Sequence, residues 1–180
     1  MAQDNQLEAW LAQESEVVAR IHAGVGAGVA TPQMVAGKSG METMQAMLRG
    51  ELPYPPIAKT LDFQLLEVDE GRALFQGIPG PAHLNPMGGV HGGGYATLLD
   101  SALGCAVHTM MPPGRGYTTA ELGVNLVKAI NIAKTTRVRA EGKIIHCGRQ
   151  LATAEARLYG PDGTLYAHAT TTCLVFELPK

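Results

Sequence analysis

The sequence has few aromatic residues, no excess of charge of either sign and no long apolar run. Only 5% of its 180 residues are aromatic, so a platform of stacked rings for single-stranded nucleic acid is not expected. A formal net charge of -2 and a pI near 6.3 exclude a sequence-wide basic field for nucleic acid or an anionic membrane. No stretch approaches the roughly 20 apolar residues that cross a bilayer. We therefore expect neither nucleic acid nor a membrane as a partner.

Cysteine is also scarce. Cys105, Cys147 and Cys173 are odd in number, widely spaced and set among apolar neighbours, which is typical of buried thiols rather than of disulfides or a zinc site. The acidic N-terminal segment has neither a basic region nor an apolar core, so no signal peptide is expected. These features predict a cytoplasmic protein without a metal or a cofactor.

Glycine, by contrast, is abundant, with 22 residues in a chain long enough for one compact domain. The first part, residues 1–54, is predicted to be a helical extension and a possible lid. It contains an amphipathic helix over 5–22, glycines at 24, 26 and 28 that suggest a hinge, and a helix over 41–48 capped by Ser39. Residues 55–180 are predicted to form the main domain.

The main domain is predicted to have an α+β fold, with one long central helix and an antiparallel sheet curved around it. The helix over 93–111 is apolar on every face, which predicts burial on all sides. The segments with the alternating pattern of strands are 61–69, 72–78, 117–130, 133–147, 149–160 and 164–177.

Asp100 is the only acidic residue between Glu70 and Glu121, and it lies within this apolar helix. A carboxylate there needs a local partner, a raised pKa or a wet cleft. It is either a structural group that bonds a neighbouring loop or a general base or nucleophile.

Three glycines, Gly92, Gly93 and Gly94, stand at the start of the same helix. Free backbone N–H groups at a helix N-terminus can stabilise negative charge on a carbonyl oxygen, although such glycines can also serve tight packing. A dinucleotide loop is disfavoured, because no βαβ unit surrounds them. Gly92 and Asp100 are eight residues apart, or roughly 12 Å along a helix, so a shared substrate requires two protomers.

The loop before the helix contains His83, Asn85 and His91. A metal site is disfavoured because no acidic or cysteine ligand lies close in sequence. We expect Asn85 to supply an amide near the reacting centre and His91 to organise the loop.

The segment HLNPMGGVHGGGYATLLDSALG resembles the hotdog-fold acyl-CoA thioesterases of the phenylacetate-degradation (PaaI-like) group, in the 4-hydroxybenzoyl-CoA thioesterase superfamily. The residues that match the pattern are Asn85, Gly88, His91, Gly92, Gly93 and Asp100. The segment YTTAELGVNLVKA is similar to the strand that follows the central helix in that family, with Thr119 at its polar position.

The resemblance implies a hotdog fold and hydrolysis of an acyl-CoA thioester to a free acid and CoA. It implies that Asp100 is the base or nucleophile, that the Gly92 amide polarises the carbonyl, and that Asn85 and Thr119 orient water or substrate. Gly88 and Gly93 would contact the substrate. It also implies a homodimer with composite sites, with pairing of dimers into tetramers.

A CoA substrate needs cations for its phosphates. Lys128, near a strand end, and Arg149, at a turn, are the preferred candidates. Most of the basic residues in this part of the chain are expected on solvated strand faces: Lys128, Lys134, Arg137, Arg139, Lys143, Arg149 and Arg157.

Three points stay open at this stage. The methionines of 41–48 and Tyr54 suit either an acyl pocket or ordinary packing. The chain could instead be a dehydratase or hydratase of acyl thioesters, although the glycine triplet followed by Asp100 favours hydrolysis. It could also bind acyl-CoA without catalysis, although binding alone does not need a carboxylate in an apolar helix.

Overall fold

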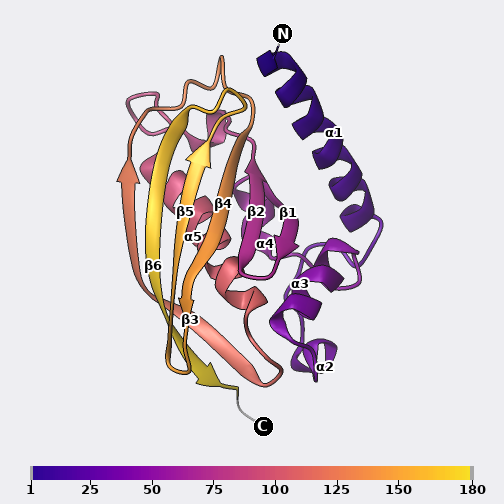
Figure 1. Ribbon diagram of the computed structural model, residues 1–180. Coiled ribbons are helices and arrows are strands. Elements are labelled where there is room, and N and C mark those ends of the chain that lie inside the picture. The colour runs from indigo at the N-terminus through magenta and orange to yellow at the C-terminus, as the bar shows by residue number, and fades with distance from the viewer. Residues whose placement is uncertain (1, 179–180) are drawn as a thin grey trace.

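The computed structural model describes residues 2–178, and it contains one six-stranded sheet and one long central helix (Figure 1). The helices are α1 (Ala2–His22), α2 (Pro32–Val35), α3 (Gly40–Leu48), α4 (Pro56–Thr60), α5 (Gly92–Thr109) and the 3-10 turn η1 (Pro81–His83). The strands are β1 (Phe63–Asp69), β2 (Arg72–Gly77), β3 (Arg115–Leu126), β4 (Val138–Cys147), β5 (Leu151–Tyr159) and β6 (Leu165–Glu177). All pairings are antiparallel in the order β1-β2-β4-β5-β6-β3, which confirms the predicted α+β class.

The sheet accommodates α5 because the strands carry small residues on the face that meets it. Ala152, Ala154 and Ala156 on β5 are all buried, and α5 contributes Leu99 and Leu103 to the same core. At Gly142 a Cβ atom would lie 2.2 Å from the main-chain oxygen of Ala102, so only glycine permits this approach. No helix within residues 2–178 is both long enough and apolar enough to span a membrane.

Two expectations about these elements are wrong. The predicted strands 117–130 and 133–147 are shorter in the structure, because residues 127–137 form a loop that turns on Asn131. The central helix is not buried on all sides, since the sheet covers only part of it. Thr97, Asp100 and Cys105 remain partly exposed on the other side.

Helix α1 packs on the outer face of the sheet, opposite α5. Trp10 is buried there, with the Arg139 guanidinium 4.3 Å from its ring centre and Tyr159 at its edge. Arg139 Nη2 donates to Gln13 Oε1 at 2.7 Å, and Nε donates to Gln76 Oε1 at 2.8 Å. This contact is rich in polar groups, whereas the contact between α5 and the sheet is apolar.

Two of the arginines predicted on solvated strand faces therefore have a different role. Arg139 is only 7% exposed, and burial lowers the pKa of its guanidinium. Arg137 Nε donates to Glu14 Oε2 at 2.6 Å. Both hold α1 against the sheet, and their positions in an alternating strand pattern gave no sign that a helix covers them.

Helix α3 packs on the C-terminal end of α5. Ser39 and Glu42 form the capping box at its start, as Ser39 predicted. A Cβ atom at Gly40 would lie 1.8 Å from the carbonyl oxygen of His108, and Met44 belongs to the main hydrophobic core. The methionine-containing segment thus packs in the core, at the end of α5 that lies away from Gly92.

The glycines at 24, 26 and 28 do not form a free hinge. Val25 N–H donates to the Gly50 carbonyl at 3.0 Å, and Gly28 N–H donates to the Tyr54 carbonyl at 2.9 Å. A Cβ atom at Gly24 would lie 2.0 Å from the Gly50 oxygen. Glycine is needed here for a close crossing of two backbone segments.

Candidate active site

The loop that leads into α5 is organised by the side chain of Asn85. Its Oδ1 accepts from Met87 N–H at 2.9 Å and from Gly89 N–H at 3.1 Å. Gly88 has a φ of +80°, which favours glycine in the turn between them. Asn85 is thus primarily a loop residue, as is Gly88, and the Nδ2 group of Asn85 is the part that remains to contact a substrate.

The start of α5 leaves one backbone donor for a ligand. His91 is the N-cap residue, and its Nδ1 accepts from Gly93 N–H at 2.9 Å. Gly94 N–H donates to the His91 carbonyl, also at 2.9 Å. Gly92 N–H has no acceptor among the described residues and stands at the positive end of the helix dipole. The Gly93 N–H is thus already paired, contrary to its predicted contact with the substrate, whereas the Gly92 N–H is available to a ligand.

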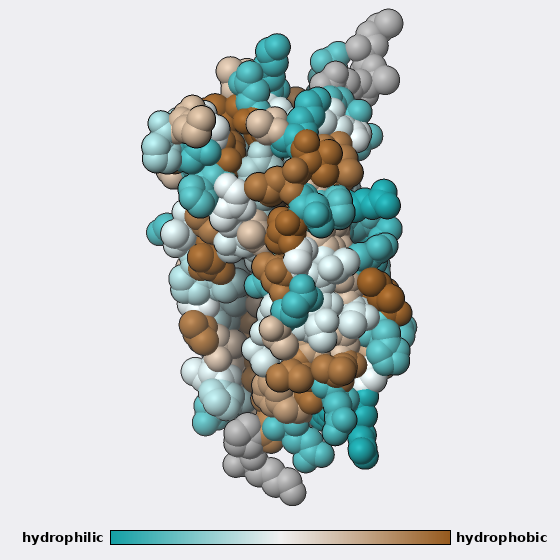
Figure 2. All heavy atoms as spheres, turned by 90° about the vertical axis from the view of Figure 1, so that its left-hand side faces the viewer, coloured by the Kyte–Doolittle hydropathy of each residue, from teal (hydrophilic) through white to brown (hydrophobic). Residues whose placement is uncertain are grey.

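A shallow groove of about 210 Å³ runs beside this helix start, between Val90, Tyr95 and residues 126–129. Leu126 overhangs Gly92, where a Cβ atom would lie 2.9 Å from Leu126 Cδ1. Leu126 and Val127 are more than half exposed, on the side of the molecule where β3 is the edge strand. Figure 2 shows that side, with clusters of hydrophobic residues separated by polar ones.

The two predicted phosphate ligands lie far apart. Lys128 lines the groove beside the start of α5. Arg149 lies near the other end of β3, where its carbonyl accepts from the Arg115 side chain. The 12 residues of β3 correspond to roughly 36–40 Å. Within one protomer only Lys128 is close to Gly92.

Asp100 pairs with Thr119, a contact that the sequence did not predict. Thr119 Oγ1 donates to Asp100 Oδ1 at 3.0 Å. Strand β3 has a β-bulge between Thr119 and Glu121, which shifts its register with β6 at this point. A bulge changes the direction in which the neighbouring side chains point. Asp100 therefore has the local partner that its position required.

The carboxylate opens into a cleft of about 220 Å³. The residues that line it are Pro55, Phe63, Phe75, Asp100, Ser101, Gly104, Cys105, Tyr117 and Thr119. Burial raises the pKa of the Cys105 thiol to about 12, and burial raises that of the Tyr117 hydroxyl well above its usual value. Both groups therefore stay protonated near neutral pH.

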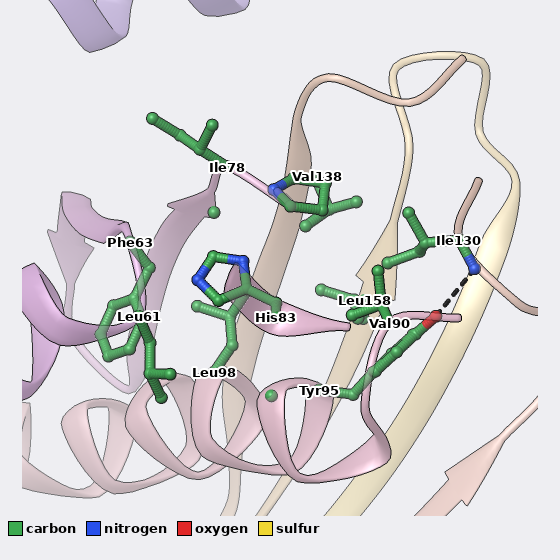
Figure 3. Close-up of a pocket in the computed structure, with 13 residues that line it drawn as sticks. Leu61, Phe63, Ile78, His83, Val90, Tyr95, Leu98, Ile130, Val138 and Leu158 are labelled. Atoms are coloured by element: carbon green, nitrogen blue, oxygen red, sulfur yellow. Dashed lines mark hydrogen bonds between the residues drawn. The ribbon is translucent and has the colours of Figure 1, made fainter. Parts of the chain in front are cut away.

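A separate apolar pocket of about 40 Å³ lies between the N-terminal part of α5 and the sheet (Figure 3). Two of its side chains are polar. The Tyr95 hydroxyl accepts from Ile130 N–H at 2.8 Å, and His83 places a buried imidazole in the wall. The position of His83 was not foreseen, because nothing in a glycine- and proline-rich loop indicates that a histidine turns inward.

The predicted site residues thus fall into two groups on α5. Asn85, His91, Gly92 and Lys128 gather at its N-terminus, while Asp100 and Thr119 meet roughly 12 Å further along. No group of three or more His, Cys, Asp or Glu residues within 2–178 is placed to hold a metal ion.

Comparisons with known proteins identify the family of the chain. Residues 87–167 match the family model described as Thioesterase superfamily. A putative thioesterase of Ralstonia eutropha JMP134, described as a phenylacetic acid degradation-related protein, is 30% identical, with a TM-score of 0.65 over 72% of this chain and 97% of its own.

Two further structures are similar. A thioesterase family protein from Silicibacter pomeroyi is 27% identical, with a TM-score of 0.62 over 68% of this chain and 90% of its own. A mutant of the phenylacetic acid degradation protein PaaI from Thermus thermophilus is 25% identical, with a TM-score of 0.59 over 66% of this chain and 97% of its own. No curated protein sequence matches the chain significantly. The chain belongs to the thioesterase superfamily and has the hotdog fold of its PaaI-like members.

Proposed function

We propose that the protein hydrolyses acyl-CoA thioesters to a free carboxylic acid and CoA. The observation that carries this proposal is the free Gly92 N–H at the start of the helix that also holds the Asp100–Thr119 pair. A donor for a developing oxyanion and a carboxylate held by one hydroxyl are the groups that thioester hydrolysis needs.

In this mechanism the thioester oxygen accepts from Gly92 N–H, which draws electron density from the carbonyl carbon. Asp100 either removes a proton from the water that attacks this carbon or attacks it directly. In both routes the tetrahedral intermediate collapses, the C–S bond breaks, and the sulfur leaves as CoA thiolate and takes up a proton. Water attack yields the free acid at once, whereas direct attack leaves the acyl group as an anhydride on Asp100, which a second step hydrolyses with one water to the free acid and the restored carboxylate. Thr119 holds one carboxylate oxygen, so the other faces the substrate.

The working site combines two protomers. Gly92 and Asp100 lie roughly 12 Å apart on one helix, so one carbonyl group cannot contact both. The outer edge of β3 has no strand beside it within the described chain, and apolar side chains lie exposed next to Gly92. A two-fold dimer with antiparallel α5 helices would bring Gly92 of one protomer to Asp100 of the partner subunit. Lys128, beside Gly92, would meet the CoA phosphates.

The direct test measures free CoA thiol released from short-chain, medium-chain and aromatic acyl-CoAs. We expect turnover of at least one of them, and a fall of about 10²- to 10⁴-fold in kcat for Asp100→Asn, because the amide cannot act as base or nucleophile. Circular dichroism of the variant checks its fold. Full activity in Asp100→Asn would contradict the mechanism.

Two other functions give different results in the same experiment. A non-catalytic binder would bind acyl-CoA without releasing thiol. A hydratase would convert an enoyl-CoA while the thioester stays intact, and ¹³C NMR of the product would detect it. Either result would overturn the proposal.

A further inference from the structure

Tyr117 lies on the same face of β3 as Thr119, because residues two apart on a strand point to the same side. Both residues line the cleft into which Asp100 opens. The ring of Tyr117 packs edge to face with that of His108, with 5.5 Å between the ring centres. The phenol side chain is thus fixed between β3 and α5, at the wall of the Asp100 cleft.

Gly104 gives the Tyr117 hydroxyl its place. A Cβ atom at Gly104 would lie 3.1 Å from the hydroxyl oxygen and 3.3 Å from Cε2, so the end of the ring lies directly on the backbone of α5. Glycine lowers the stability of a helix relative to alanine, and Gly104 stands well inside α5. The helix therefore has an unfavourable residue at the point where the hydroxyl group lies.

The hydroxyl group has no hydrogen-bond partner among the described residues. Burial, together with the nearby Cys105, Cys173 and Asp100, raises its pKa well above the usual value, so the oxygen keeps its proton. A largely enclosed donor without an acceptor is unfavourable, and native proteins seldom contain one that neither a water molecule nor a ligand satisfies. The Tyr117 hydroxyl is therefore a donor that is available to a molecule in the cleft.

The spacing along α5 indicates which molecule that is. Asp100 and Gly104 are four residues apart on one helix face, which places their Cβ positions about 5–6 Å apart. Since the Tyr117 hydroxyl lies over Gly104, a similar distance separates it from the Asp100 carboxylate. One water molecule with two hydrogen bonds of about 2.8 Å each spans this distance. Thr119 occupies Oδ1 of Asp100, so Oδ2 is available to that water.

We propose that Tyr117 and Asp100 together hold the water molecule that hydrolyses the thioester. The Tyr117 hydroxyl donates to the water oxygen, one water proton points to Asp100 Oδ2, and the remaining lone pair faces the thioester carbon. This lone pair forms the C–O bond while the proton moves to Asp100, which then returns it to the departing thiolate. Tyr117 keeps its own proton throughout. The inference rests on the proposed thioesterase function and assigns it the water route, with Tyr117 as a further catalytic residue.

The first test is Tyr117→Phe, assayed by thiol release. Phenylalanine keeps the ring that packs on His108 but removes the donor to the water. We expect kcat to fall about tenfold while KM stays within about twofold, because the variant loses a contact with the water and not with the bound substrate. The free energy of unfolding in urea should stay the same or rise, since the hydroxyl group has no partner in the described chain. A role in packing alone predicts the reverse, namely lower stability with unchanged kcat.

Tyr159→Phe is the matched control. The Tyr159 hydroxyl also has no hydrogen-bond partner among the described residues, but its ring packs on Trp10 on the opposite face of the sheet. This variant should keep kcat within about twofold of wild type. Wild-type kcat in Tyr117→Phe, or an equal loss of kcat in both variants, would overturn the proposal.

A crystal structure provides a readout that does not depend on turnover. The wild type should contain a water molecule within about 3.2 Å of both the Tyr117 hydroxyl and the Asp100 carboxylate, and Tyr117→Phe should lack it. A wild-type cleft without this water, in a structure that resolves other ordered waters, would refute the proposal.

A single turnover in H₂¹⁸O tests the route itself. The label should enter the product acid, and its appearance in the Asp100 carboxylate would show direct attack and overturn the proposal. Absence of thiol release from every acyl-CoA would refute the proposed function and this inference together. Turnover that Tyr117→Phe leaves unchanged would refute only the role of Tyr117.

Discussion

The N-terminus and the middle of α5 offer opposite chemistry within one helix. At the N-terminus, Gly92 presents a backbone donor beside apolar residues and the cation Lys128. In the middle, Asp100 presents a carboxylate that is held by Thr119 and opens into a cleft. One position suits developing negative charge, and the other suits proton removal or attack on carbon. Since one helix holds them roughly 12 Å apart, the site that we propose combines Gly92 of one protomer with Asp100 of the partner subunit.

Among changes that leave Asp100 itself in place, removing the donor at the N-terminus of α5 should have the largest effect. Gly92→Pro deletes the N–H but retains the helix, because proline is favoured at the first helical position and His91 already has a ψ of 133°, which suits a residue before proline. We expect kcat to fall about 10²- to 10³-fold, as for the loss of other oxyanion donors. The measurement is steady-state thiol release with the best acyl-CoA.

Gly92→Ala provides the control for that change. It keeps the N–H and adds only a Cβ atom against the flexible end of Leu126. It should retain most of the activity. If the alanine and proline variants lose activity equally, Gly92 acts through packing and not through its amide.

A smaller effect is expected in the middle of the helix from Thr119→Val. Valine matches the shape of threonine but cannot donate to Asp100 Oδ1, so the carboxylate loses its orientation and a charge-assisted hydrogen bond. We expect kcat to fall about tenfold with little change in KM. Thr119→Ser should restore the rate, and a valine variant with wild-type kcat would show that the bond does not position Asp100.

The smallest effect on activity is expected on the far side of the sheet. Arg139→Met removes the donors to Gln13 and Gln76 while keeping the packing of the stem under Trp10. The free energy of unfolding in urea should fall by about 2–3 kcal/mol, with kcat within twofold of wild type. Arg157→Met, exposed on the same face, should change stability by less than about 0.5 kcal/mol. A large loss of kcat in Arg139→Met would contradict this expectation and would show that the packing of α1 affects the active site.

Local sequence patterns predicted much of this architecture. Alternation located all six strands to within a few residues, except where residues 127–137 leave the sheet, and the apolar run located α5. Ser39 and its capping box, and the turn glycine at 71 with a φ of +70°, are local features whose chemistry is visible in the sequence. The isolation of Asp100 in an apolar segment indicated a residue that needs a partner.

Contacts between distant segments could not be predicted in this way. The burial of Arg139 depends on α1, which lies more than 100 residues away in the chain. The inward turn of His83 depends on how η1 packs against α5. The use of the Gly93 amide by His91 depends on the rotamer of the cap residue. Each of these contacts depends on tertiary packing, which residue type and spacing alone do not predict.

Mixing two inactive variants tests the two-protomer site most directly. Gly92→Pro and Asp100→Asn subunits are exchanged at equal concentration, so that about half of the dimers contain one subunit of each kind. In each mixed dimer one site combines an intact Gly92 with an intact Asp100, and the other site has both defects. We predict recovery of about a quarter of the wild-type activity. Activity that stays at the level of the separate variants, after mass spectrometry has confirmed subunit exchange, would contradict a site shared between protomers.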